Sequence, residues 1–262
     1  MLDAAGAVAQ DEHPGLDPQA VLGDIDRLAG RLRARLPTDA SAMQRLRALN
    51  HYFFDELAFG GNVNDFYDRR NSYVHEVLAT RRGIPITLAL VYCEMATQLG
   101  LSARGVSFPG HFLVKLRMPQ GEVVIDPFNG RSLSREALDE RLQPYRRRHG
   151  LEGDFETPLG LFLQAAPSRD VLARLLRNLK EIHGTAEDWP RLLAVQHRLV
   201  LLLPDAADER RDRGLTWAAL GRHAEAADDL QAYLLARPEA EDACALRERL
   251  AELQRGGAPR LH

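Results

Sequence analysis

One run of the chain, PITLALVYCEMATQL from Pro85 to Leu99, limits the possible folds more than any other stretch. Proline suits the first position of a helix, which needs no N–H, and Gly100 suits the left-handed residue after the last turn. Ten of the 14 residues from Ile86 to Leu99 are apolar, and they occupy nearly every side of the helix. A helix of this kind is buried on most of its surface. The rest of the domain is therefore expected to pack around it.

The segments before this helix are also helical in pattern. Residues 17–59 repeat apolar side chains at helical spacing. After the polar connection GGNVNDFYDRR, a further helix is expected to begin at Asn71 or Ser72, which are both good N-caps, and to run to about Thr80.

The period changes after the buried helix. The segment ARGVSFPGHFLVKLRMPQGEVVIDPFNG, residues 103–130, alternates Val, Phe and Leu with smaller or polar residues. This pattern predicts two strands joined by a turn from Pro119 to Gly121. A buried helix followed by a hairpin indicates an α+β domain.

The C-terminal part is predicted to be a separate set of helices. A proline-bearing break, TPLGLFLQAAPSRD, marks a boundary, so we expect domains over residues 1–160 and 168–262. Pro204 and Pro238 are 34 residues apart, which is the period of the tetratricopeptide repeat. The unit that ends at Pro238 resembles this repeat closely. Its small residues at helix crossings are Gly214 and Ala226, its large aromatic is Trp217, and its turn glycine is Gly221.

Composition excludes several classes of function. The formal charge of −3 and a pI near 6.3 give no field that would attract nucleic acid or an anionic membrane surface. The two cysteines, Cys93 and Cys244, do not suggest a disulfide framework. The first residues lack a signal-peptide pattern, and no stretch is apolar for the roughly 18 residues that span a bilayer. We therefore expect a cytoplasmic protein without a membrane segment.

A histidine and an aspartate follow the buried helix in an order that suits catalysis. In cysteine hydrolases and acyltransferases, the nucleophile often lies at the start of a buried helix, where the helix dipole lowers the thiol pKa. A histidine holds the proton and a carboxylate orients the imidazole. The segment 83–126 supplies a helix start, His111 on the first expected strand and Asp126 on the second.

Taken together, these motifs resemble a known family. The helix from Pro85, with GHFLVKL and VIDPFNG, resembles the core of the transglutaminase-like superfamily, whose motifs run G-x-C…LG, H-a-W and D-P. The whole chain, with RNSY, FPGHFLV and the repeat tail, resembles the bacterial SirB-type family. The resemblance implies a papain-like or transglutaminase-like helix-plus-antiparallel-sheet domain followed by tetratricopeptide repeats. It places His111 and Asp126 at the family's histidine and aspartate, and Pro85 at its cysteine.

Proline has no nucleophilic side chain, so Thr87 and Cys93 are the candidate substitutes. Thr87 lies in the first helical turn, and its hydroxyl could face His111 if the two were within about 3 Å. The commoner role of a hydroxyl near a helix start is a bond to the backbone or to bound water. Cys93 lies about 12 Å further along the helix, in its apolar interior, where a thiol is usually inert. His111 and Asp126 themselves could form a buried pair that tethers two strands, and the proline favours this interpretation.

The sequence predicts no metal and no cofactor. No His or Cys pair has the spacing of metal ligands, and His51 and His75 are remote from each other. The glycine pairs form no phosphate-loop pattern.

The leading hypothesis is a non-catalytic transglutaminase-like protein whose repeats bind a protein or peptide partner, with Trp217 and Tyr233 as candidate contacts. The alternative is an amide hydrolase or acyltransferase that uses His111 and Asp126 with Thr87 or an activated water. The resemblance also suggests a link to transcriptional regulation, which the composition does not support as direct DNA contact.

Overall fold

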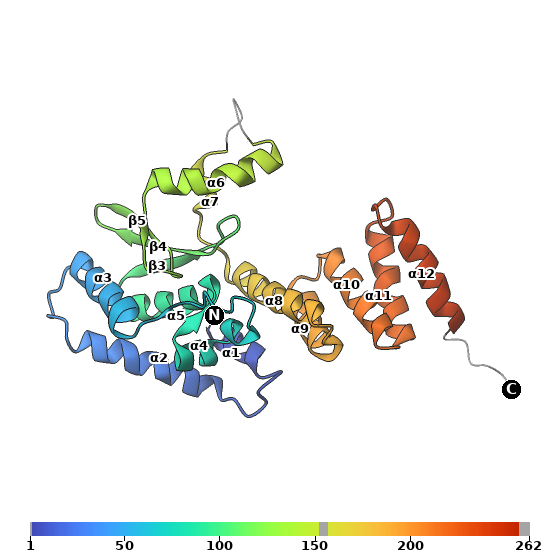
Figure 1. Cartoon of the computed structure of the whole chain (residues 1–262), viewed down its shortest axis with the longest axis horizontal. Helices are drawn as coiled ribbons and strands as arrows, with labels where there is room; N and C mark the ends of the chain where they lie inside the picture. The colour runs from blue at the N-terminus through green and yellow to red at the C-terminus, as the bar shows by residue number, and fades with distance from the viewer. Residues whose placement is uncertain (1, 152–156, 257–262) are drawn as a thin grey trace. The chain divides into compact units, whose positions relative to one another are not determined.

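The computed structural model describes residues 2–151 and 157–256, and it divides into two compact units (Figure 1). Unit 1 is Met1–Leu172, and unit 2 is Ala173–His262. Unit 1 combines helices with a small antiparallel sheet, which confirms the expected α+β class. Within the described ranges, no helix is both long enough and apolar enough to cross a membrane.

The first half of unit 1 is mainly helical. Its elements are α1 (Leu2–Ala9), α2 (Pro18–Arg33), α3 (Ala42–Asn50), the π-helix η1 (His51–Glu56), β1 (Gly60–Gly61), the 3-10 helix η2 (Arg69–Ser72), α4 (Val74–Thr80), β2 (Arg82–Gly83) and α5 (Pro85–Gln98). The short strands β1 and β2 pair in parallel.

Helix α5 lies at the centre of unit 1, as its apolar sequence predicts. It begins at Pro85, and Gly100 follows its last turn with a φ of +73°. Leu88, Val91 and Met95 each have 0% exposure. Helices α2, α3 and α4 and strands β3 and β4 pack against it, and Figure 1 shows the sheet on one side of α5 and α2 on the other. The start and end of this helix are therefore set by local signals, and its position by its all-round apolar surface.

The main sheet has the order β3-β4-β5-β6, with every neighbouring pair antiparallel. Its strands are β3 (Ser102–Val106), β4 (Leu113–Met118), β5 (Gly121–Ile125) and β6 (Ser132–Leu133). The predicted turn between β4 and β5 is confirmed, with Met118 opposite Gly121.

The prediction of one strand before that turn was wrong, because the chain reverses within it. Pro109 and Gly110 form a tight turn in which His111 N donates to Phe108 O at 3.0 Å, and Gly110 has a φ of +70°. Proline followed by a glycine with positive φ is the signature of a type II turn. This turn separates β3 from β4, so His111 lies in the loop just before β4 and not on a strand.

The predicted helix start at Asn71 or Ser72 is also corrected. These residues belong to η2, and α4 begins at Val74 with Tyr73 as its N-cap. The Asn71 amide instead donates to the carbonyl oxygens of Asp65 and Phe66, at 2.7 and 3.2 Å. Its side chain therefore holds the preceding loop and does not cap a helix.

The chain continues from the sheet into α6 (Arg135–His149) and α7 (Leu159–Phe162). These helices cover an apolar cluster on the sheet. Its buried members are Val106, Phe108, Leu113, Val124, Leu138, Leu142 and Leu159.

Unit 2 consists of paired helices. Helix α8 (Ser168–Thr185) crosses the boundary between the units, and α9 (Trp189–Leu202), α10 (Ala207–Ala219), α11 (His223–Ala236) and α12 (Ala243–Gly256) follow. A Cβ atom at Gly214 would lie 3.0 Å from Leu230 Cγ, so the predicted close crossing of α10 and α11 is confirmed. Gly221, with a φ of +72°, makes the turn between them.

Candidate functional site

The predicted histidine and aspartate are hydrogen-bonded in unit 1. His111 Nε2 lies 2.8 Å from Asp126 Oδ1, and Phe128 N donates to the same oxygen at 3.0 Å. The Pro109–Gly110 turn positions His111, and Asp126 directly follows β5. The Asp126 side chain is 3% exposed, whereas the His111 side chain is 25% exposed. The imidazole therefore lies at the edge of the core with its carboxylate partner beneath it.

Arg141 completes this group, and sequence reasoning missed it. Its Nη1 donates to Asp126 Oδ2 at 3.0 Å from α6. Burial alone would raise the pKa of Asp126. The hydrogen bonds from His111, Phe128 N and Arg141 lower it by more than burial raises it, so the pKa lies below its ordinary value. Asp126 is therefore a carboxylate at neutral pH. No local pattern links Arg141 to Asp126, because helix α6 reaches the site only in the folded chain.

Asp126 also organises the loop in which it lies. Its backbone O accepts from Gly130 N at 2.8 Å, and its backbone N donates to Arg131 O at 2.9 Å. The motif DPFNG is thus a compact turn whose first side chain points inward. One residue joins this turn, the His111 loop and α6.

Thr87 is fully buried, and its hydroxyl is committed to the backbone. Thr87 Oγ1 lies 2.7 Å from Asn71 O and 3.0 Å from Ile84 O, both of which are acceptors. In the described part of the chain it has no hydrogen bond to His111. The hydroxyl thus serves to join α5 to the segment before α4, as hydroxyls near helix starts commonly do.

Pro85 and Cys93 both lie on α5. Pro85 is the first residue of α5 and is buried. Cys93 is in the middle of that helix, beside a cavity of about 490 Å³, and burial raises its pKa to about 12. Among the described residues, its sulfur forms no hydrogen bond with His111. Neither residue supplies a thiolate at the imidazole.

The two cysteines are expected to differ in reactivity. At about pH 8, iodoacetamide should label Cys244, which is exposed, at least tenfold faster than Cys93, whose raised pKa leaves very little thiolate. Mass spectrometry of time points measures the two rates. A Cys244→Ser variant should lack the fast phase, and equal rates in the wild type would contradict the environment described for Cys93.

Comparison with known proteins decides the family. A family model described as "Transglutaminase-like superfamily" matches residues 19–177, and one described as "Tetratricopeptide repeat" matches residues 179–251. The chain belongs to the transglutaminase-like superfamily. The transglutaminase-like region thus covers α5, His111 and Asp126, and the repeat region covers most of unit 2.

Similar full-length proteins carry the name UPF0162. One from Xylella fastidiosa is 36% identical over 254 residues, covering 97% of this chain and 89% of the relative. Another from Pseudomonas aeruginosa is 30% identical over 262 residues, covering 100% of this chain and 94% of the relative. This transglutaminase-like chain is thus similar to them in both regions.

A shorter similarity reaches a different kind of protein. "F-box only protein 21" of Homo sapiens is 46% identical over 72 residues, which is 28% of this chain and 12% of that protein. No solved structure matches this transglutaminase-like chain.

The repeat residues predicted to contact a partner have different environments. Tyr233 is 2% exposed, and its hydroxyl donates to Asp242 Oδ1 at 2.8 Å, so its ring belongs to the core of unit 2. This corrects its expected role as a contact residue. Trp217 is half-buried against that core, with the Arg222 guanidinium 5.1 Å from its ring centre.

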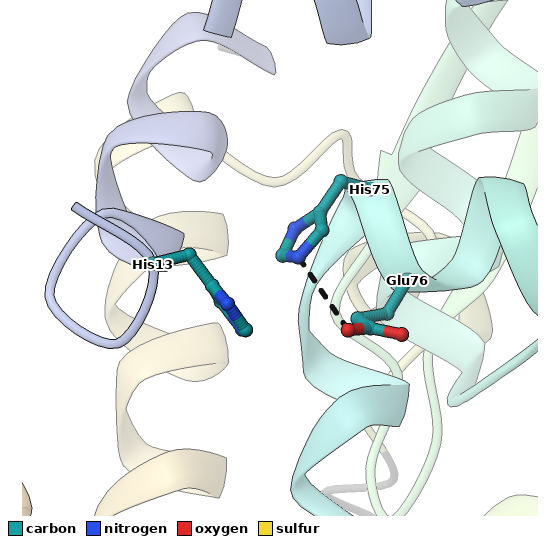
Figure 2. A group of neighbouring side chains, drawn as sticks. All are labelled: His13, His75 and Glu76. Carbon is teal, nitrogen blue, oxygen red and sulfur yellow. Dashed lines mark ion pairs between the residues drawn. The ribbon is translucent and has the colours of Figure 1, made fainter. Parts of the chain in front are cut away.

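A group of possible metal ligands lies elsewhere in unit 1. In the described part of the chain, His13, His75 and Glu76 bring ligand atoms within 4.8 Å of one another (Figure 2). The spacing of ligands in the sequence did not indicate it, because His13 and the other two residues come from distant segments.

Proposed function

We propose that this chain is a non-catalytic transglutaminase-like protein of the cytoplasm that binds a protein or peptide partner through the helices of unit 2. The tetratricopeptide match over residues 179–251 supports the binding role, since such repeats commonly present extended surfaces to other proteins. Pro85 at the first position of α5 is the observation that carries the non-catalytic part. The narrower SirB-type affiliation suggested by the motifs belongs to the same proposal.

The groups around α5 support the absence of thiol chemistry. A cysteine enzyme needs a thiolate at the helix start, in reach of its imidazole. Position 85 has an imino ring, the Thr87 hydroxyl is bonded to two carbonyls, and the Cys93 thiol has a raised pKa. The chain thus retains the base and its carboxylate without a nucleophile for them.

In this proposal the His111–Asp126 pair has a structural role. Asp126 joins the loop before β4, the turn after β5 and helix α6 through bonds to three partners. Buried carboxylates with several donors are stable because each lone pair is satisfied. The pair then stabilises the sheet edge, and its loss should affect folding and not turnover.

Two exposed leucines are the proposed contacts on unit 2. Leu201 in α9 and Leu235 in α11 are 81% and 77% exposed, and each lies three residues before the proline that ends its repeat, Pro204 or Pro238. Equivalent positions of successive repeats fall on the same face of the stack. A single exposed leucine needs no explanation, but a pair in register on one face offers two apolar anchors to a partner.

The test compares three full-length variants as baits in the lysate of cells that produce the protein. The pair Leu201→Ser with Leu235→Ser should lose a captured partner that the wild type and His111→Ala both retain. The matched control is the single variant Leu215→Ser, which changes a 42% exposed leucine of α10. Retention of every captured protein by the double variant would contradict the proposed surface.

His111→Ala is expected to lower the free energy of unfolding by about 1 kcal/mol, the usual worth of one hydrogen bond. Urea unfolding measures the change, and His149→Ala on α6 is the control histidine.

A second function is favoured by one observation. His111 Nδ1 has no hydrogen bond among the described residues, while Nε2 is oriented by Asp126, an arrangement that could activate water for amide hydrolysis or acyl transfer. Release of amine from a panel of acyl amides would decide between the two. Turnover by the wild type that His111→Ala abolishes, with folding intact, would support the hydrolase and contradict the non-catalytic proposal.

A further inference from the structure

We propose that His13, His75 and Glu76 form a binding site for a divalent transition-metal ion of the zinc class. The three side chains come from two segments of unit 1. His13 lies in the connection between α1 and α2, and His75 and Glu76 lie in the first turn of α4. Figure 2 shows them around a common space, with the His13 ring on one side and the α4 side chains on the other.

The distances suit coordination better than direct hydrogen bonding. The donor atoms all lie within 4.8 Å of one another, and His75 Nε2 is 3.6 Å from Glu76 Oε1. That separation is too long for a good hydrogen bond. Two ligands that are each about 2.0–2.1 Å from a tetrahedral zinc ion are about 3.4 Å apart. Small side-chain rotations would therefore bring the three atoms onto one ion.

His75 has an unmet need for a polar partner. Its Nδ1 is buried with no hydrogen bond in the described part of the chain, and its Nε2 meets only the distant Glu76 carboxylate. Buried polar nitrogens in native structures nearly always have a partner. A metal ion would take one nitrogen of this imidazole as its ligand, either Nδ1, which has no partner, or Nε2, which faces the Glu76 carboxylate.

The local fold holds the His13 segment against α4. Glu12 accepts from the Tyr73 hydroxyl and pairs with Arg69 Nε at 3.0 Å. The His13 ring lies edge-on to His75, with ring centres 4.7 Å apart, and also contacts the ring of Tyr73. The contacts of Glu12 thus join the residues that precede the ligands in both segments, and little ordering is left for the metal to impose.

The chemistry of the ligands selects the class of ion. Calcium and magnesium prefer oxygen ligands, whereas two imidazoles and one carboxylate suit zinc, cobalt or nickel. Three protein ligands leave a fourth position for water or another small ligand.

Cationic side chains also lie close to the site. A cavity of about 230 Å³ beside His75 is lined by Arg27, Arg31 and Arg81. Arg27 pairs with Asp24, and the Arg81 guanidinium lies 4.6 Å from the ring centre of Phe59. Asp24 therefore offsets the charge of Arg27, whereas Arg81 Nη1 is buried without a hydrogen bond in the described part of the chain. The Glu76 carboxylate and the two imidazoles must outweigh the remaining positive charge for a divalent ion to bind.

The experiment uses the full-length chain, freed of metal with a chelator, and titrates it with Co²⁺ and with Zn²⁺. Visible ligand-field bands of Co²⁺ report coordination by protein nitrogen, and calorimetry with Zn²⁺ gives the affinity and stoichiometry. We expect one equivalent of each ion in the wild type. His13→Ala and Glu76→Gln should each weaken binding at least tenfold, because each removes one of three ligands.

His51→Ala is the matched control. His51 lies close to two carboxylates, 3.0 Å from Asp55 Oδ2 and 3.7 Å from Glu56 Oε1, but on an exposed helix surface. The His51→Ala variant should bind Zn²⁺ with the same affinity as the wild type. Chelator-treated His13→Ala should unfold at the same urea concentration as the chelator-treated wild type, which separates loss of a ligand from loss of folding. Binding that is absent in the wild type, unchanged in His13→Ala, or equally weakened in His51→Ala would overturn the proposal.

Discussion

Replacing Asp126 with alanine is expected to lower the free energy of unfolding by about 3 kcal/mol, the largest effect of any single change considered for unit 1. Removing one partner of a buried charged pair costs about 3–5 kcal/mol, because the other charge stays unpaired in the core. The lower end applies here, since Arg141 is 39% exposed and His111 is 25% exposed. Urea unfolding followed by circular dichroism measures the change.

The control for this variant is Asp24→Ala. Asp24 also pairs with an arginine, Arg27, but its side chain is 47% exposed. Exposed pairs contribute about 0–1 kcal/mol, so the free energy of unfolding of this variant should be close to that of the wild type. If Asp126→Ala and Asp24→Ala had equal effects, the bonds to Asp126 would not support the sheet edge.

The same carboxylate gives a pH dependence with a defined sign. The pKa of Asp126 is lower in the folded chain than its ordinary value, so the folded state favours the charged form. Its contribution is fully present above the unfolded pKa of about 3.9 and is lost as the pH falls through the lower folded value. The stability difference between the wild type and Asp126→Asn should therefore shrink below about pH 4.

Gly61→Ala is expected to destabilise the chain by about 1–3 kcal/mol, the usual cost of overpacking. A Cβ atom at this position would lie 2.0 Å from Phe128 Cε2 and 2.1 Å from its Cζ, so the ring must move. Gly61 N also donates to Phe128 O at 2.8 Å, which limits how far the backbones can separate. Displacement of Phe128 should also disturb its N–H bond to Asp126.

Gly60→Ala is the neighbouring control. A Cβ atom there would meet Phe128 O at 3.6 Å, which is ordinary contact, so a near-neutral effect on the free energy of unfolding is expected. Phe128→Leu should recover part of the stability of Gly61→Ala because the two residues are in contact and their effects are not additive. If the effects of the two substitutions simply added in the double variant, the strain in Gly61→Ala would not come from Phe128.

Local signals in the sequence were sufficient for the central helix. Pro85 and Gly100 gave its start and end, and the all-round apolar pattern placed it in the core, where the structure has it. The repeat period and the small residue at Gly214 likewise predicted the crossing of α10 and α11. These features depend on backbone preferences and on packing over a few turns, which neighbouring residues encode.

Other features depended on contacts that no local pattern encodes. The alternating apolar neighbours of the motif FPG predict a strand, although Pro109 and Gly110 together are a turn signal. Arg141 reaches Asp126 only through the packing of α6, and His13 meets His75 only because α1 and its following loop lie against α4. Side chains from distant segments meet as a result of tertiary packing, so sequence spacing could not predict them.

Pro85 at the first position of α5 determines what a substitution there would change. In any α-helix the first backbone position is left without an intrahelical acceptor for its N–H, so proline there removes no bond from α5 and leaves the histidine loop and its aspartate in place. A single substitution at residue 85 would therefore change the side chain at the start of α5 without removing a backbone hydrogen bond of the helix.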